Sequence, residues 1–146
     1  MWYDGEKCYT WQGVNEMQRF DKNSAEGLRK LIYNSYAHDA KLESVEYRCA
    51  EDELKIKQFN PIFNVKLDLD IHGVGMFLTV RGEEHGSRDT LISLTVEEDF
   101  SYLQTYLKNG SACSDDCLYL LFQMFSGGEL HVAAKEVTVL IDRSET

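Results

Sequence analysis

Cysteine and long apolar runs are both scarce in this chain, and each scarcity argues against a class of protein. The 146 residues include one proline and four cysteines. No apolar run approaches the ~18 residues that a membrane-spanning helix needs, and the N-terminal MWYDGEKCYTWQG lacks a basic region followed by an apolar stretch. We therefore expect no membrane partner and a cytoplasmic location, where cysteines this sparse are predicted to be reduced thiols.

Positive charge is also in deficit. The chain has 15 lysines and arginines against 25 aspartates and glutamates, which gives a formal net charge of -10. A field of this sign repels phosphate backbones, so we expect no nucleic acid partner. The same field speeds encounter with a cationic protein, which makes a basic protein the expected partner. An acidic balance also serves solubility alone, and that explanation needs no partner.

Motifs for catalysis and ligand binding are missing as well. Gly73-Val74-Gly75 and Gly127-Gly128 follow no phosphate-loop pattern. Cys113 and Cys117 are separated by three residues, so they form no CxxC turn, and a surface disulfide or half of a two-cysteine metal site stays open. The histidines at positions 72, 85 and 131 lack metal-ligand spacing. We predict no catalytic residue, no bound metal and no cofactor.

Two segments have the apolar spacing of a helix. Residues 21–36 contain a start signal at Asn23 or Ser24. Their apolar positions at helical intervals are Leu28, Leu31, Ile32 and Tyr36. A second helix is predicted to begin at Thr95, which has capping-box spacing to Glu98. Its apolar stripe consists of Phe100, Leu103, Tyr106 and Leu107.

Much of the remaining chain alternates apolar and polar residues, which is typical of half-buried strands. The candidate strands are 42–49, the stretch around Leu54 and Ile56, 64–71, 76–82, 90–96, 130–134 and 136–141, with 7–11 as a short edge strand. Residues 117–125 are nearly all apolar, so we expect a central strand that is covered on both sides. The sequence predicts one α+β domain over residues 1–146: an antiparallel sheet of about six strands in a meander, with two helices packed on one face.

The His38-Asp39 pair lies where the helical period changes to the strand period. Some metal-dependent phosphohydrolases use such a dipeptide, but in an all-helical domain with further histidines, and this chain contains too much strand. We expect Asp39 to accept hydrogen bonds from backbone N–H groups and His38 to interact with the last carbonyls of the helix. A metal-dependent enzyme that uses His38, Asp39 and His72 is the alternative.

Four acidic residues are predicted to form a binding face, namely Glu43, Glu46, Asp68 and Asp70. Asp68 and Asp70 project from one face of a strand, about 7 Å apart at their Cα atoms. This separation could suit a pair of catalytic carboxylates. The run from Asp68 to Gly73 also imitates a calcium loop, but Thr79 stands where the final glutamate is needed. We favour a binding face, with Trp11 or Trp2 as an aromatic anchor.

The stretches SYAHDAKLESVEY and EDELKIKQFNP resemble small bacterial proteins in which an HD dipeptide leads into a strand of the form HDxxLxxI. Some of those proteins look like immunity proteins of polymorphic toxin systems, and the resemblance covers residues 28 to 81. It implies that the protein binds and blocks a basic toxin in the cytoplasm and has no enzymatic role. An oligomerisation module, with residues 117–125 as an interface strand, is a further alternative.

Overall fold

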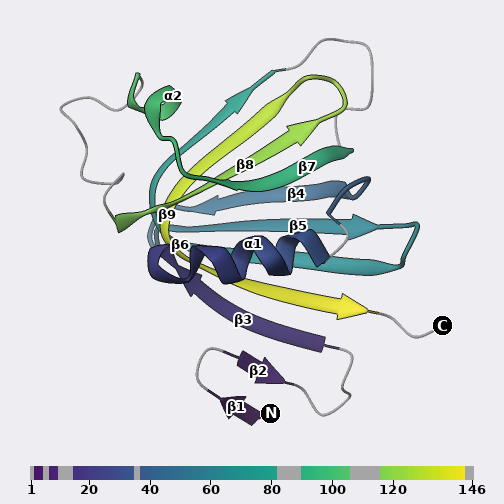
Figure 1. Ribbon diagram of the computed structural model, residues 1–146. Coiled ribbons are helices and arrows are strands. Elements are labelled where there is room, and N and C mark those ends of the chain that lie inside the picture. Colours follow the sequence, from purple (N-terminus) through teal and green to yellow (C-terminus); the bar gives the residue numbers. More distant parts are fainter. Residues whose placement is uncertain are drawn as a thin grey trace.

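A computed structural model of the chain describes residues 2–4, 7–9, 15–34, 37–81, 90–105 and 116–143, without the side chains of residues 2–4, 7–9, 15, 16 and 34. The described part contains nine strands, a 3-10 turn and two α-helices (Figure 1). The strands are β1 (Trp2–Asp4), β2 (Lys7–Tyr9), β3 (Asn15–Asp21), β4 (Lys41–Arg48), β5 (Glu53–Asn60), β6 (Val65–Val80), β7 (Leu91–Glu97), β8 (Leu118–Met124) and β9 (Glu129–Arg143). The helices are α1 (Ala25–Asn34), which follows the turn η1 (Lys22–Ser24), and α2 (Ser101–Gln104).

All nine strands belong to one antiparallel sheet with the order β1-β2-β3-β9-β6-β5-β4, and β8 joins β7 to β9. The α+β class is confirmed, but the prediction of about six strands in a meander is wrong. The C-terminal strand β9 lies in the middle of the sheet, between β3 and β6. The pairing with β3 joins positions as distant as Asn15 and Asp142, and local periodicity does not predict which distant segments pair.

The pair formed by β6 and β9 is bent. Both strands curve together in Figure 1, and the register of the pair shifts between Val74 and Met76. Gly73 has a φ of 65°, a conformation that only glycine adopts without strain. The sequence predicted two shorter strands in place of each of these, 64–71 and 76–82 in place of β6, and 130–134 and 136–141 in place of β9. Each pair is a single strand, because backbone pairing continues through the bend.

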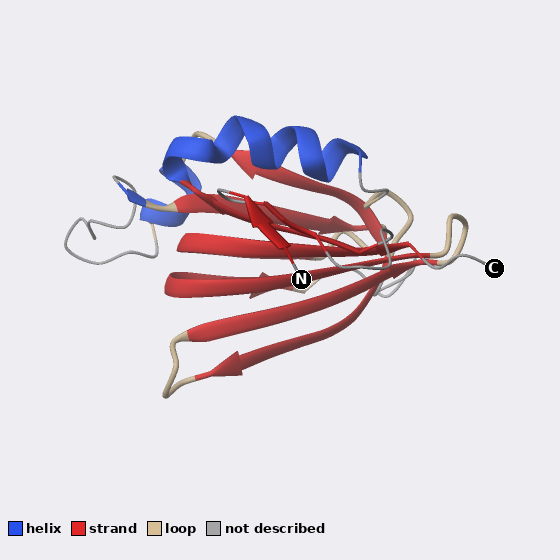
Figure 2. Cartoon of the chain, turned by 90° about the horizontal axis from the view of Figure 1, so that it is seen from below, coloured by secondary structure: helices blue, strands red, loops and turns tan. Residues whose placement is uncertain are grey.

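The bend divides the sheet into two leaves around one core. The first leaf contains β7, β8 and the N-terminal part of β9, and the second contains β3 to β5 with the C-terminal part of β9. Inward-facing side chains of both leaves, such as Phe122 and Ile56, belong to one buried cluster. Leu28 and Ile32 of α1 complete that cluster. Figure 2 shows α1 lying across one side of the strands.

The two helices pack on opposite faces of the sheet, which corrects the prediction that they share one face. Leu103 of α2 is buried with Tyr119, Leu121 and Ala133, whose side chains point away from the main core. The strand β8 is therefore covered on both sides, as predicted for residues 117–125. It is also hydrogen-bonded along both edges, to β7 and β9. Because both edges of β8 are already paired within one chain, the strand offers no free edge to a second copy.

The ends of the helices also differ from the prediction. Asp21, and not Asn23 or Ser24, caps the first turn, and it forms a capping box with Ser24. Thr95 lies in β7, because its neighbours Leu94 and Val96 are buried in the main core. Only Ser101–Gln104 is helical in α2, and residues 106 and 107 of the predicted stripe lie outside the described residues.

The bend yields a stability prediction. A Cβ atom at Gly73 would lie 3.0 Å from the Cβ of Lys135, which is tighter than most real Cβ contacts and would require Lys135 to shift, and the positive φ adds backbone strain. Gly73→Ala is expected to lower the free energy of unfolding by about 2 kcal/mol or more. Gly127→Ala is the matched control, because its φ is 86° and its Cβ would meet nothing within 4 Å. Urea denaturation should show the larger loss for Gly73→Ala, and equal losses would contradict the role given to the bend.

Candidate functional site

The His38-Asp39 pair lies in the turn between α1 and β4, and backbone hydrogen bonds fix this turn to β7. The Asp39 N–H donates to the Leu91 carbonyl at 2.9 Å, and the Leu91 N–H donates to the Ala40 carbonyl at 2.8 Å. Asp39 has a φ of 68°, which aspartate tolerates better than most residues. Its carboxylate lies 3.0 Å from Nδ1 of His38. The imidazole is mostly exposed, so the pair is presented to solvent on a rigid turn.

Asn60 positions this turn and a second one. Its side chain is buried, and its Nδ2 donates to the His38 carbonyl at 3.1 Å. Its Oδ1 accepts from the N–H groups of Ile62 and Phe63, at 2.9 and 3.3 Å. One amide therefore connects the turn before β4 to the turn between β5 and β6. The sequence marked Asn60-Pro61 only as the end of a strand, and that end is confirmed.

Exposed apolar side chains gather around His38. Tyr33 is 89% exposed, Phe63 55%, Phe125 47% and Ile92 39%. Phe125 contacts the His38 ring edge-to-face, and the other three line a cavity of about 430 Å³ with His38 and Asp39. We call Tyr33, His38, Phe63, Ile92 and Phe125 the His38 patch. These five residues come from α1, β7 and three separate turns, so only the folded chain brings them together.

The sequence contained a weak signal for one member of the patch. Tyr33 lies off the apolar stripe of Leu28, Leu31 and Ile32, so it was a large aromatic residue on the solvent side of a predicted helix. Phe63 and Phe125 are in turns, where periodicity does not apply. Grouped exposed apolar side chains are typical of interaction sites, whereas isolated ones are common on any protein surface.

Three of the four predicted acidic residues, Glu46, Asp68 and Asp70, lie on the outer face of β4 and β6, opposite to the core, and Glu43 lies at the bulge of β4 where the register with β5 shifts. We call Glu43, Glu46, Asp68 and Asp70 the acidic strand face. They do not form an uninterrupted acidic patch, because β5 runs between the two strands. In its register, Lys55 lies between Glu46 and Asp70, and Lys57 lies between Ser44 and Asp68. The face therefore alternates in charge from strand to strand.

Asp68 is the electrostatically unusual member of this face. Burial raises its pKa, Lys57 opposes the rise, and the charges of Asp70 and Glu43 add to it. The sequence expectation that Asp68 and Asp70 share a face with Glu46 is confirmed by the strand register.

The remaining predicted site residues lie apart from the His38 patch or outside the described part of the chain. Trp11, His85 and Cys113 lie outside the described residues, and the side chain of Trp2 is not described. His72 lies on the outer face of β6, 3.9 Å from Glu53, and not beside His38. Among the described residues there is no group of three or more His, Cys, Asp or Glu side chains that could hold a metal ion.

Cys117 corrects the expectation of reduced thiols, because it takes part in a disulfide. Cys49 is a free, exposed cysteine. Cys117 is 3% exposed and belongs to the small cluster under α2. No helix in the described part of the chain is both long and apolar enough to cross a membrane.

A buried polar relay occupies the outer face under α2. The Tyr119 hydroxyl lies 2.5 Å from Nδ1 of His131, and Nε2 of His131 lies 3.1 Å from Glu129. Burial raises the pKa of Tyr119 to about 12, and Glu97 and Glu129 add to the rise. Tyr119 is therefore protonated at neutral pH and donates to His131, whose other nitrogen donates to Glu129. His131 is 3% exposed beneath the stacked ring of Tyr102, so the relay stabilises the fold and is closed to a substrate.

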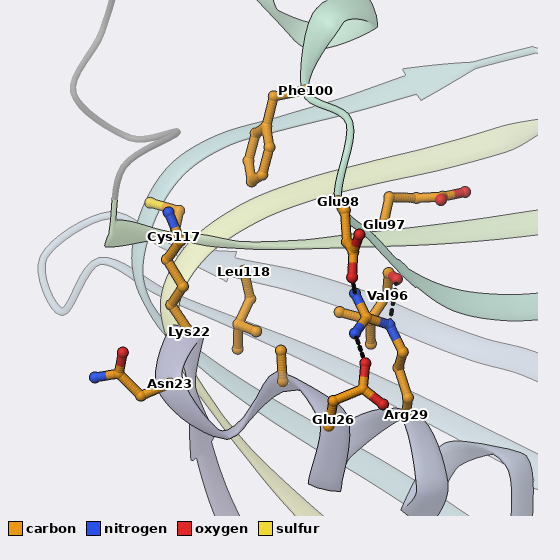
Figure 3. Close-up of a pocket in the computed structure, with 11 residues that line it drawn as sticks. Lys22, Asn23, Glu26, Arg29, Val96, Glu97, Glu98, Phe100, Cys117 and Leu118 are labelled. Atoms are coloured by element: carbon orange, nitrogen blue, oxygen red, sulfur yellow. Dashed lines mark hydrogen bonds and ion pairs between the residues drawn. The ribbon is translucent and has the colours of Figure 1, made fainter.

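Figure 3 shows a second cavity, of about 360 Å³, between the start of α1 and the segment after β7. Arg29 reaches across it. Its Nε donates to the Val96 carbonyl at 3.0 Å, and its guanidinium pairs with Glu26 and with Glu98. Because two carboxylates already neutralise the single guanidinium, Arg29 is not available to bind an anionic ligand. This arrangement fixes α1 to β7 and so supports the Tyr33 side of the His38 patch.

No protein-family model matches the chain, and neither a curated protein nor a solved structure matches it significantly. The resemblance to immunity proteins therefore stays a prediction.

Asn60→Asp tests whether one amide organises the patch. The variant keeps an oxygen that can accept from Ile62 and Phe63, but it sets a carboxylate oxygen against the His38 carbonyl. We expect a loss of about 1–3 kcal/mol in the free energy of unfolding, because a buried hydrogen bond is replaced by repulsion. Asn64→Asp adds the same charge to the same turn at a half-exposed position and should cost less than about 0.5 kcal/mol. Similar losses in urea denaturation would show that Asn60 has no special role.

Asp68→Asn tests the effect of burial on the acidic strand face. A raised pKa means that the folded chain binds this proton more tightly than the unfolded chain does, so ionised Asp68 costs stability at pH 7. The cost disappears as the pH falls through the folded-state pKa. Asp68→Asn should therefore raise the free energy of unfolding at pH 7 by up to about 0.5 kcal/mol, and this gain should vanish near pH 3.

The control for Asp68→Asn is Glu46→Gln, which removes a charge from the same face at an exposed position. Denaturation midpoints of both variants are compared at the two pH values. A pH-independent effect of Asp68→Asn, or the same pH-dependent gain in Glu46→Gln, would contradict the explanation by burial.

Proposed function

We propose that this chain is a small acidic protein-binding module that engages a basic protein through the His38 patch. The observation that carries the proposal is the convergence of four exposed large apolar residues on one rigid turn. Binding energy at protein interfaces is concentrated in a few apolar and aromatic anchors of this kind. The cavity beside His38 could receive one apolar side chain of a partner.

Charge supports a basic partner. The net charge of -10 gives the protein a field that attracts cationic surfaces and accelerates their encounter. Glu43 lies four residues after Asp39, in the strand that begins directly after the turn. Within the cavity lining itself, the carboxylate of Asp39 lies beside His38. Lysines of β5 interrupt the acidic strand face. We therefore expect this face to select a partner whose charges match the alternating pattern, and not any partner that is merely positive.

The resemblance in residues 28 to 81 supports a more particular proposal, an immunity-type inhibitor that blocks a basic toxin in the cytoplasm. Inhibition would result from occlusion and would require no catalytic residue, metal or cofactor in this chain. In the cytoplasm the glutathione and thioredoxin systems keep most thiols reduced. The disulfide at Cys117 therefore weighs against the cytoplasmic part of this proposal, and inhibition by occlusion does not depend on it.

The test is co-expression of the chain with the products of neighbouring genes, followed by capture at low and high salt and by calorimetry of any complex. Phe63→Asp should weaken binding at least tenfold, because it places a charge in the apolar centre of the patch. The matched control is Ile62→Asp, which changes an exposed residue of the same turn that does not line the cavity. We expect a loss below about threefold for Ile62→Asp, in line with a rim position.

Two outcomes would contradict the proposal. If no basic protein binds even at low salt, the proposed class of partner is wrong. If a complex forms and both variants bind as the unchanged chain does, the His38 patch is not the binding site.

A further inference from the structure

The strand β4 lies at one end of the sheet and has an unpaired edge. In the described part of the chain, β5 pairs with one side of β4, and on the other side only Lys41 has a partner, Thr90. Every residue from Glu43 to Arg48 is exposed. An edge of this kind presents a row of free backbone N–H and C=O groups that another strand can pair with.

Both faces beside this edge carry side chains that could recognise a strand. On the inner face Val45 is 40% exposed and Tyr47 37%, and the Tyr47 ring contacts the partly exposed ring of Phe77, with centroids 5.1 Å apart. On the outer face lies Glu46, and Glu43 lies at the bulge of β4. An added strand would therefore place alternate residues against apolar and acidic neighbours.

Natural sheets often protect their edges, and β4 has some of the usual devices. The register with β5 shifts between Leu42 and Ser44, and Lys41 and Arg48 place charges at the two ends. From Ser44 to Arg48, however, the pairing with β5 is regular. This regular run keeps two exposed apolar side chains, which a purely protective edge would replace by polar ones.

We propose that β4 accepts an extended strand from a basic partner protein, so that the partner continues the sheet. The inference rests on the proposed protein-binding function and adds a second contact to it. Charge selects the occupant. The strand itself is neutral, because Lys41 and Arg48 balance Glu43 and Glu46, and the acids Glu51, Asp52 and Glu53 that follow it bring residues 41–53 to two positive and five negative charges, or -3. Glu46 also pairs with Arg48 at 3.5 Å, so the attraction for a basic strand comes from the turn after β4 and from the net charge of the chain. A second copy of the chain, with its net charge of -10, would be repelled.

The experiment uses the full chain and three capped heptapeptides as probes. One alternates lysine and valine, the second is the same peptide with N-methyl groups on alternate amides along one edge, and the third alternates glutamate and valine. Amide exchange and NMR shifts of residues 44–48 are recorded with each peptide. We expect the lysine peptide to protect these amides, the N-methylated peptide to bind at least tenfold more weakly, and the glutamate peptide not to bind.

Variants separate this edge from the His38 patch. Glu46→Lys should weaken the lysine peptide several-fold, because it reverses the charge opposite the incoming lysine. Phe63→Asp should leave peptide binding unchanged, since it alters a different surface. If the N-methylated peptide binds as tightly as the parent, backbone pairing is absent and the inference is overturned.

Two other outcomes would also overturn it. If the amides of β4 become protected in the peptide-free protein as its concentration rises, the occupant is a second copy. If a basic partner binds at the His38 patch, as shown by its loss in Phe63→Asp, but leaves the β4 amides unprotected, then the inference that β4 accepts a strand is wrong and the proposed function still stands. Failure of the proposed function would give a different result, in which no basic protein binds at the His38 patch.

Discussion

The bend in the β6–β9 pair is the constraint on which the rest of the structure depends. A glycine at position 73 allows the backbone to turn where a Cβ atom would require Lys135 to shift, and the two strands stay paired on either side of the turn. A flat sheet of these strands would leave one apolar face in water. The bend closes two leaves on each other, so that the alternating apolar residues share one core with Leu28 and Ile32 of α1.

The same bend creates the interaction surfaces. It brings the start of β7 to the start of β4, where Leu91 bonds to Asp39 and Ala40, and it places the turn after β8 beside Thr90. The His38 patch exists because these turns meet there. Among the described residues, β4 meets the first leaf through hydrogen bonds only near Lys41, so the rest of β4 keeps a free edge. The apolar patch and the open edge are thus two results of one closure.

Polar groups in this protein divide by burial into structural and surface roles. The Tyr119–His131–Glu129 relay and the Asn60 amide are buried, and their hydrogen bonds hold elements together. His38, Asp39 and the acidic strand face are accessible, and they are bordered by exposed apolar residues or by lysines. The described surface therefore combines apolar anchors with an alternating charge pattern, and these are the two features on which the proposed binding function rests.

The sequence by itself determined the α+β class, the position of α1, the buried strand 118–124, the strand end at Asn60 and the shared face of Asp68 and Asp70. These features follow from local periodicity and turn chemistry, which act over a few residues. Only the tertiary structure decided the strand order, the continuity of β6 and β9 through their bend, and the opposite placement of the helices. It also decided that lysines interleave with the predicted acidic face and that Tyr33, Phe63, Ile92 and Phe125 gather around His38. Each of these depends on backbone pairing or packing between residues distant in the chain, and local patterns carry no information about which distant segments meet.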